Sequence, residues 1–236
     1  ENSTLVTLTF ENISLKSKSG SAILDGVNGS IEPGQITAIM GESGSGKTTL
    51  LQILAGQRYP SCGHVLMNKT PMNIASKRYI GMVPQEDAFL PTITVEEAIQ
   101  FSADVRLPVE CEKRSRVNDL MDKLGLSKIR NVRIGDPRLR KGISGGERKR
   151  VSIAMEMVHS PRVLLLDEPT SGLDSTSALQ VVELLRRVSK EEGVAVCISI
   201  HQPSARLFAL LDQLVVVHGG VVVYRGAAAE ALAHFA

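Results

Sequence analysis

The chain has 236 residues, of which 43% are hydrophobic and 22% charged, and its formal net charge at pH 7 is +2. This composition predicts a globular protein with a sizeable core, and the small net charge gives no reason to expect nucleic acid as a partner. No apolar run approaches the ~20 residues needed to span a bilayer, and no signal peptide is visible. Because the sequence starts at Glu1 without an initiator Met, we expect a soluble piece of a longer protein.

The first forty residues predict a small antiparallel sheet. Segments rich in β-forming residues lie at 5–10 and 23–27, with a polar loop between them. A turn at 32–35 leads into an apolar, β-branched run at 36–40, which is typical of a buried strand.

A Gly-rich loop follows this strand and precedes a helix predicted at 49–55. It fits the pattern G-x-x-x-x-G-K-[ST], in which glycines let backbone N–H groups wrap phosphates at the helix N-terminus. Lys47 then supplies a charge for the β- and γ-phosphates, and Thr48 a hydroxyl ligand for Mg²⁺. We expect a nucleotide to contact Gly41, Glu42, Ser43, Gly44, Ser45, Gly46, Lys47, Thr48 and Thr49. The loop alone leaves kinases, GTPases and motor ATPases open.

The middle of the chain is mainly helical. After short predicted strands at 64–68 and 79–83, Thr94 and Glu97 have the spacing of a capping box, and 112–124 is a charged amphipathic segment. We predict a helical subdomain at about 86–160.

The last third predicts a β-α-β unit and a hairpin. Near-continuous apolar runs at 163–166 and 194–200 are typical of parallel strands buried on both faces, and apolar residues recur at helical spacing between them. Strands at 214–217 and 221–224 flank a Gly-Gly turn.

Two acids end the strand at 163–166. An acid at the carboxyl end of a buried strand beside a phosphate loop suits a Mg²⁺ ligand, which is the role expected of Asp167. Glu168 is placed to act as a general base for an attacking water.

Residues 143–150 read Ile-Ser-Gly-Gly-Glu-Arg-Lys-Arg. Ser144 and Glu147 have the spacing of a second capping box, yet two glycines at a helix start cost up to ~1 kcal/mol each relative to Ala. Glycines at this position are expected if phosphate must approach the backbone. The pair therefore predicts a second phosphate-binding helix N-terminus. The basic triplet 148–150 is interpreted as a solvated helical face.

Together these motifs resemble the nucleotide-binding domain of an ATP-binding cassette (ABC) transporter. Residues 41–48 are similar to the Walker A motif, 143–147 to the signature motif, 164–167 to Walker B, 171–174 to the D-loop, Gln85 to the Q-loop glutamine and His201 to the switch histidine. Details such as Ser-Gly-Gly-Glu-Arg-Lys-Arg at 144–150 and Ile-His-Gln-Pro-Ser at 200–204 resemble the G subfamily, the White-type half-transporters.

The resemblance implies a P-loop NTPase α/β fold over 1–236, with a RecA-like parallel-sheet core, an N-terminal antiparallel β-subdomain and the helical insert. It implies ATP hydrolysis that powers transport of a lipid, sterol or other amphipathic substrate. Its expected partners are a second nucleotide-binding domain and a transmembrane domain, which would place the chain at the cytoplasmic face of a membrane.

The resemblance also implies roles for single residues. Two chains would pair head to tail, with ATP on one chain covered by the signature residues of the other: Ser144, Gly145, Gly146 and Glu147. Thr48, Gln85 and Asp167 would hold Mg²⁺. Glu168, His201, Gln85 and Lys47 would serve catalysis, and Asp174 would act across the dimer.

One position departs from the family pattern. Where an aromatic ring usually stacks on adenine, this chain has Leu15. Base stacking on an aromatic residue is worth roughly 1–3 kcal/mol, so we expect weak nucleotide affinity and poor discrimination of ATP from GTP.

Three other classes of protein share part of this pattern. A GTPase would need N-K-x-D, but residues 68–71 read Asn-Lys-Thr-Pro and lack the Asp. A soluble ABC ATPase of DNA repair or translation would carry a long coiled coil or a second cassette, and this sequence shows neither. A silent, nucleotide-binding regulatory subunit is disfavoured by intact Lys47, Ser144, Glu168 and His201.

Overall fold

The computed structural model describes residues 5–17, 19–136 and 142–235, and their strands form two sheets. The antiparallel sheet has the order β2-β1-β4-β5, with β1 (Leu8–Lys16), β2 (Ala22–Ile31), β4 (Cys62–Met67) and β5 (Thr70–Pro71). The larger sheet has the order β10-β9-β3-β8-β7-β6, with β3 (Ile36–Met40), β6 (Ile80–Val83), β7 (Val163–Leu166), β8 (Ala195–Ile200), β9 (Gln213–His218) and β10 (Val221–Ala227). It is parallel except for β10, which pairs antiparallel with β9.

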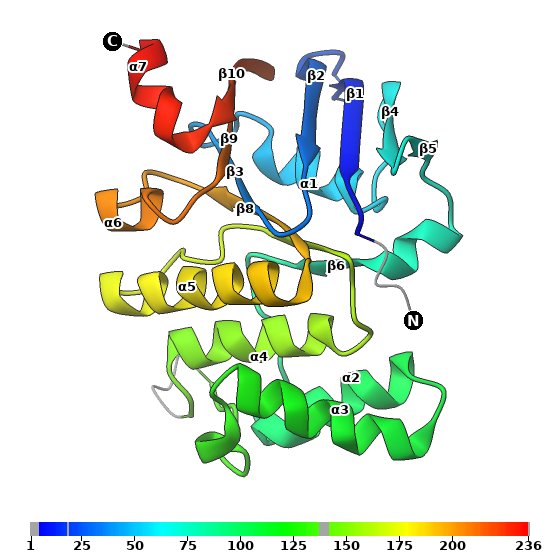
Figure 1. Ribbon diagram of the computed structural model, residues 1–236, viewed down its shortest axis with the longest axis vertical. Helices are drawn as coiled ribbons and strands as arrows, with labels where there is room; N and C mark the ends of the chain where they lie inside the picture. Colours follow the sequence, from blue (N-terminus) through cyan, green and yellow to red (C-terminus); the bar gives the residue numbers. More distant parts are fainter. Residues whose placement is uncertain (1–4, 18, 137–141, 236) are drawn as a thin grey trace.

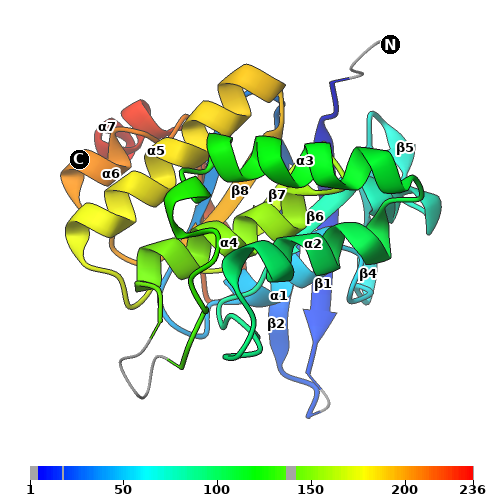
Figure 2. The same cartoon turned by 90° about the horizontal axis from the view of Figure 1, so that it is seen from below.

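The helices are layered on the larger sheet (Figures 1 and 2). They are α1 (Lys47–Leu54), α2 (Val95–Arg106), α3 (Glu110–Lys123), α4 (Gly145–Met157), α5 (Ser175–Glu192), α6 (Ala205–Phe208) and α7 (Ala231–Phe235), with short 3₁₀ turns η1 (Ala75–Tyr79), η2 (Ser127–Ile129) and η4 (Ala228–Glu230). The apolar face of α1 packs in one core with β1 and β2, whereas α4 and α5 pack in the other core, to which α2 and α3 also contribute. None of the described helices has the length and hydropathy needed to cross a membrane.

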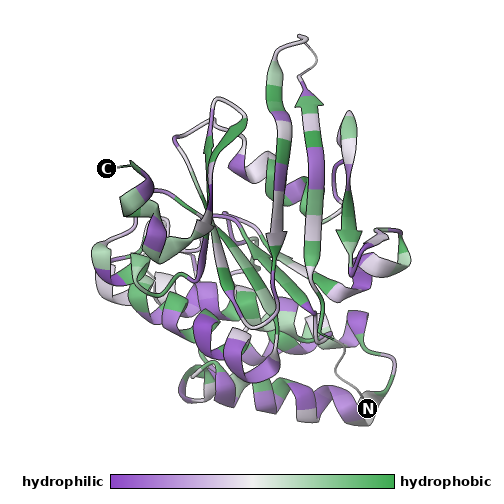
Figure 3. Ribbon diagram, turned by 45° about the horizontal axis from the view of Figure 1, so that its top comes forward, coloured by the Kyte–Doolittle hydropathy of each residue, from purple (hydrophilic) through white to green (hydrophobic). Residues whose placement is uncertain are grey.

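Alternate residues of the central strands enter different cores. In β7, Val163 and Leu165 pack on the α1 side, while Leu164 and Leu166 pack on the side of α4 and α5. Because both faces of the strand are covered, all four residues must be apolar. Figure 3 shows the resulting concentration of hydrophobic residues along the strands of this sheet. The sheet and helices thus fix the carboxyl ends of β3, β7 and β8 at one edge.

The predicted elements are present, but β2, predicted at 23–27, runs from Ala22 to Ile31, and β1 differs more. This strand was expected at 5–10, but it begins at Leu8 and extends to Lys16. Asn12 adopts a φ of 51°, and the pairing register with β2 shifts between Phe10 and Ile13. Asn tolerates the left-handed region, so a bulge at this point lets pairing continue past the polar residues.

The helical segment of the middle third is present as predicted, with α2, α3 and α4 all within 86–160. Both capping boxes form: the Thr94 and Ser144 side chains accept from the backbone N–H of Glu97 and Glu147, whose carboxylates accept in return. Division of the chain into a separate helical subdomain stays a prediction.

Candidate nucleotide-binding site

The glycine-rich loop connects the end of β3 to the start of α1. Gly46 is the N-cap of α1 with φ 103°, a conformation that L-residues rarely adopt. A Cβ on Gly46 would lie 2.7 Å from Leu24 Cδ2 and 3.0 Å from the Ile23 carbonyl oxygen. The loop therefore needs glycine both for its backbone conformation and for its close packing on β2, and it exposes the free N–H groups of the first turn of α1.

A cavity of about 320 Å³ lies over this loop. Ser43, Gly44, Gly46, Lys47, Thr48 and Thr49 line it from the loop and α1, together with Gln85, Glu168 and Ile23. The structure thus brings six of the nine predicted loop residues to one cavity, along with two predicted catalytic residues from distant parts of the chain.

Lys47 is buried, with 5% of its surface exposed, although it carries the charge expected to meet phosphate. Its Nζ donates to the carbonyl oxygens of Gly41 and Glu42, at 2.9 and 2.8 Å. These bonds hold the ammonium group inside the loop, and no carboxylate among the described residues forms an ion pair with it. An ammonium group held in this way favours binding of an anion.

Asp167 follows β7 and reaches α1. Its Oδ1 accepts hydrogen bonds from Thr48 Oγ1 at 3.1 Å and from Ser199 Oγ at 2.6 Å, and the residue is only 3% exposed. The two expected oxygen ligands of Mg²⁺, a hydroxyl and a carboxylate, therefore lie side by side.

The backbone of Glu168 adopts an unusual conformation and is held by a hydrogen bond. Its φ is 43°, unusual for a residue with a side chain, and its N–H donates to Ser199 Oγ at 2.8 Å. The Gln85 amide nitrogen donates to Glu168 Oε2 at 2.9 Å. The carboxylate is thereby oriented from one side by Gln85 and anchored through its backbone on the other.

Ser199 is a site residue that the sequence analysis missed. It is fully buried in β8, and it joins the carboxylate of Asp167 to the backbone of Glu168. A signal was present, because Ser199 is the hydroxyl residue in the otherwise apolar run of β8. A lone polar residue in a strand buried on both faces needs a hydrogen-bond partner, and the neighbouring acids supply it.

The residues at this edge fit a magnesium–nucleotide complex better than a metal held by protein alone. The described residues contain no group of three or more His, Cys, Asp or Glu side chains that could hold a metal ion. Mg²⁺ commonly takes one or two protein oxygens and completes its shell with phosphates and water, as Thr48 and Asp167 would allow.

Ser144, Gly145, Gly146 and Glu147 do not line this cavity. They form the first turn of α4, where Ser144 is exposed and its Oγ lies 2.8 Å from Glu147 Oε2. The glycines also have a reason within the chain: a Cβ on Gly145 would lie 2.9 Å from Leu173 Cδ2, and one on Gly146 would lie 3.2 Å from Ser177 Cβ. Phosphate approach is therefore no longer the sole explanation for this glycine pair.

The interpretation of residues 148–150 as a solvated face is wrong for two of the three residues, since only Arg150 is partly exposed. Arg148 and Lys149 are 9% and 4% exposed. Arg148 donates to the carbonyl oxygens of Ile134 and Gly135, at 3.0 and 2.8 Å. These long side chains are buried because they satisfy the backbone of loops that pack on α4.

Asp174 and His201 have no contact with the loop cavity. Asp174 is the N-cap of α5, accepting from the N–H groups of Thr176 and Ser177. A hydrogen bond from the Ser177 side chain, helped by these backbone N–H groups, holds the pKa of Asp174 below its usual range. His201 is exposed and follows Ile200, the partner of Met40 in the sheet. It therefore lies at the same edge as the loop, and it has no hydrogen-bond partner among the described residues.

Leu15 is not the residue that faces the nucleotide site. It is 7% exposed and packs in the core beneath the antiparallel sheet. The aliphatic residue that lines the loop cavity is Ile23, at the start of β2. Placing the missing aromatic contact at Leu15 was therefore wrong, although an aliphatic residue does stand beside the loop.

The fold and this edge of the sheet define a P-loop nucleoside triphosphatase. A sequence profile described as ABC transporter matches residues 24–171. The chain is 45% identical over 218 residues to ABC transporter G family member 22 of Arabidopsis thaliana, covering 90% of this chain and 29% of that protein. It is 44% identical over 219 residues to the broad substrate specificity ATP-binding cassette transporter ABCG2 of Sus scrofa, covering 91% and 33%.

A solved structure is similar over nearly the whole chain. It is cbiO1 from Clostridium perfringens, part of the ABC transporter complex cbiONQ, with a TM-score of 0.85 and 31% identity over 97% of this chain and 91% of that one. The chain belongs to the ABC transporter family, as an ATP-hydrolysing, nucleotide-binding domain similar to those of the G subfamily. It spans about a third of the length of the curated relatives it matches.

Proposed function

We propose that two copies of this domain, or one copy and a related domain, close head to tail around two ATP molecules. The observation that carries this proposal is the separation of the two helix N-termini that are predicted to bind phosphate. The N-terminus of α1 lies in the loop cavity, whereas that of α4, with Ser144, Gly145 and Gly146, does not contribute to it. A second chain would bring its own α4 to this cavity and supply the missing donors.

Each residue of the closed site has its own proposed role in hydrolysis. Lys47 and the α4 N-terminus of the partner subunit neutralise charge on the γ-phosphate, and His201 contacts the same group. Glu168 accepts a proton from the attacking water, held in place by Gln85. Thr48, Asp167 and Gln85 would hold Mg²⁺, which would supply positive charge to stabilise the charge on the phosphates. Asp174 acts across the dimer through the start of α5.

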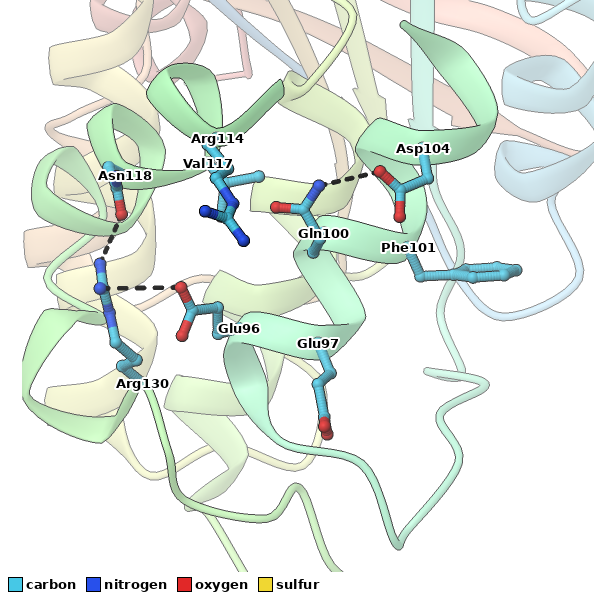
Figure 4. A pocket seen from close by; sticks show the side chains of 9 residues that line it. All are labelled: Glu96, Glu97, Gln100, Phe101, Asp104, Arg114, Val117, Asn118 and Arg130. Atoms are coloured by element: carbon cyan, nitrogen blue, oxygen red, sulfur yellow. Dashed lines mark hydrogen bonds and ion pairs between the residues drawn. The ribbon is translucent and has the colours of Figure 1, made fainter. Parts of the chain in front are cut away.

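A membrane-spanning domain is the second proposed partner. Three large apolar side chains are strongly exposed on and before α2: Leu90 at 66%, Phe101 at 65% and Val105 at 70%. Phe101 and Val105 are one helical turn apart, and Phe101 also lines the cavity between α2 and α3 (Figure 4). Exposed apolar groups of this size mark interaction surfaces. Docking there would place the domain at the cytoplasmic face of a membrane.

The proposed cargo is a lipid, sterol or other amphipathic compound, on the strength of the similarity to G-subfamily transporters. The test uses the full-length transporter reconstituted in vesicles and a panel of labelled lipids, sterols and amphipathic drugs. ATP-dependent movement of one panel member, with ATPase stimulation by the same compound, is the expected result. Hydrolysis that responds to none of them would contradict the cargo class while leaving the ATPase itself intact.

Adenine recognition should be weak, because the residue beside the loop is aliphatic. We expect Ile23→Tyr to strengthen ATP binding by up to about 1–3 kcal/mol, through stacking on the base. Titration with fluorescent ATP and GTP analogues measures this, and the wild-type chain should bind both with similar dissociation constants.

Leu15→Tyr is the matched control for this prediction. Since Leu15 is buried in the core, the larger ring should lower the melting temperature and leave nucleotide affinity unchanged. If Leu15→Tyr binds ATP more tightly and Ile23→Tyr does not, the adenine lies beside Leu15 and the prediction is wrong.

A further inference from the structure

The polar network around Lys149 is not used by the mechanism described above. Lys149 lies in the second turn of α4 and is buried, and its only acidic partner among the described residues is Asp87. The Lys149 and Asp87 side chains are 5% and 11% exposed, and their charged atoms are 2.9 Å apart. A charge pair this well buried is strongly sensitive to loss of one member.

Lys149 holds more than the carboxylate of Asp87. Its Nζ also lies 3.3 Å from the carbonyl oxygen of Pro84 and 3.2 Å from that of Gln85. Ser152, nearly one turn further along α4, donates to Asp87 Oδ1 at 2.6 Å. The segment 84–87 is therefore fastened to α4 on both sides of the Gln85 side chain.

The same segment carries the contact to the proposed general base. Gln85 Nε2 donates to Glu168 Oε2 at 2.9 Å. A continuous path of hydrogen bonds therefore runs from α4 through Lys149 and the Gln85 backbone to the Glu168 carboxylate. The N-terminus of α4, four residues before Lys149, is the helix end proposed to meet ATP bound to the second chain.

We propose that Lys149, with Asp87, is a positioning residue for hydrolysis. It ties the Gln85 segment to α4. The position of α4 on the ATP of the partner subunit then sets the orientation of Glu168 in the same chain as that α4. This inference rests on the proposed roles of Gln85 and Glu168. It gives the buried cation in α4 a function beyond stability, since a misplaced base slows proton transfer even when ATP is bound normally.

The test compares turnover with binding in the double variant Lys149→Met/Asp87→Asn, which removes both charges and so leaves no unpaired buried ion. We expect kcat to fall about 10- to 100-fold, with the dissociation constant for a fluorescent ATP analogue changed less than about 2-fold. In a Gln85→Ala background, the same double change should lower kcat by less than about 2-fold more, because the path is already broken.

Arg116→Met is the matched control. Arg116 also holds α4 through backbone carbonyls, but at its C-terminal end, donating to Met157 and Val158. Its loss should lower the melting temperature and leave kcat unchanged. The inference is overturned if Lys149→Met/Asp87→Asn keeps wild-type kcat, or if its effect multiplies fully with that of Gln85→Ala. If the wild-type chain itself hydrolyses no ATP, the proposed function fails instead.

Discussion

Glu168→Gln should lower ATP turnover by about 10²- to 10⁴-fold, the range expected when a general base is removed. The amide has the shape of the carboxylate but cannot accept a proton from water. Lys47, Thr48 and Asp167 keep their positions, so ATP still binds and the closed dimer accumulates. Steady-state phosphate release measures turnover, and size-exclusion chromatography with light scattering in ATP measures the dimer.

An exposed carboxylate on α5 provides the control for this change. Glu191→Gln makes the same chemical substitution near the C-terminal end of α5, which does not line the cavity, and it should leave turnover unchanged. If Glu168→Gln hydrolyses ATP at the wild-type rate, Glu168 is not the base.

Gly145→Asp should strongly lower ATP hydrolysis without preventing a single chain from binding ATP. The new carboxylate stands at the first position of α4, where it favours the helix itself but repels the γ-phosphate of ATP bound to the other chain. The added Cβ would meet the end of the Leu173 side chain at 2.9 Å, which can move aside. We expect turnover to fall at least about 100-fold, with the ATP-dependent dimer lost.

Gly145→Ala tests the effect of added side-chain volume without the effect of a negative charge. It introduces the same contact with Leu173 but no negative charge, so it should retain most of the dimer. Equal loss in the Ala and Asp variants would show that packing within the chain, rather than phosphate contact, explains the glycine.

Local patterns in the sequence were sufficient to predict the loop, the strand that ends in Asp167 and Glu168, and both capping boxes. Each of these depends on residues a few positions apart, whose geometry is fixed by one strand or one helix turn. The apolar runs of β7 and β8 were equally informative, because strands covered on both faces tolerate few polar residues.

Tertiary contacts decided the features that the sequence did not reveal. Lys149 looked solvated because nothing in its own helix shows that Asp87 and two carbonyl groups face it from 62 or more residues away. Ser199 likewise gains its role from acids on a neighbouring strand. Leu15 was misplaced because the irregularity at Asn12 shifts the alternation of β1, and alternation decides which side chains enter the core.

The central claim is that each ATP site is built from two chains, and mixing two inactive variants tests it most directly. Lys47→Ala disables the loop side of the site, and Gly145→Asp disables the α4 side. In a head-to-tail heterodimer of the two, one site combines both defects, while the other pairs an intact loop with an intact α4.

An equal mixture that exchanges freely should therefore recover at most about a quarter of wild-type hydrolysis, because half of the dimers contain one intact site of two. Recovery falls below a quarter to the extent that Glu168 of the intact site depends on the disabled α4 of its own chain. Phosphate release is measured for each variant alone and for the mixture at the same total concentration. Recovery well above the sum of the separate activities is the predicted result. A mixture as inactive as its components, under conditions where heterodimers are shown to form, would contradict the two-chain site.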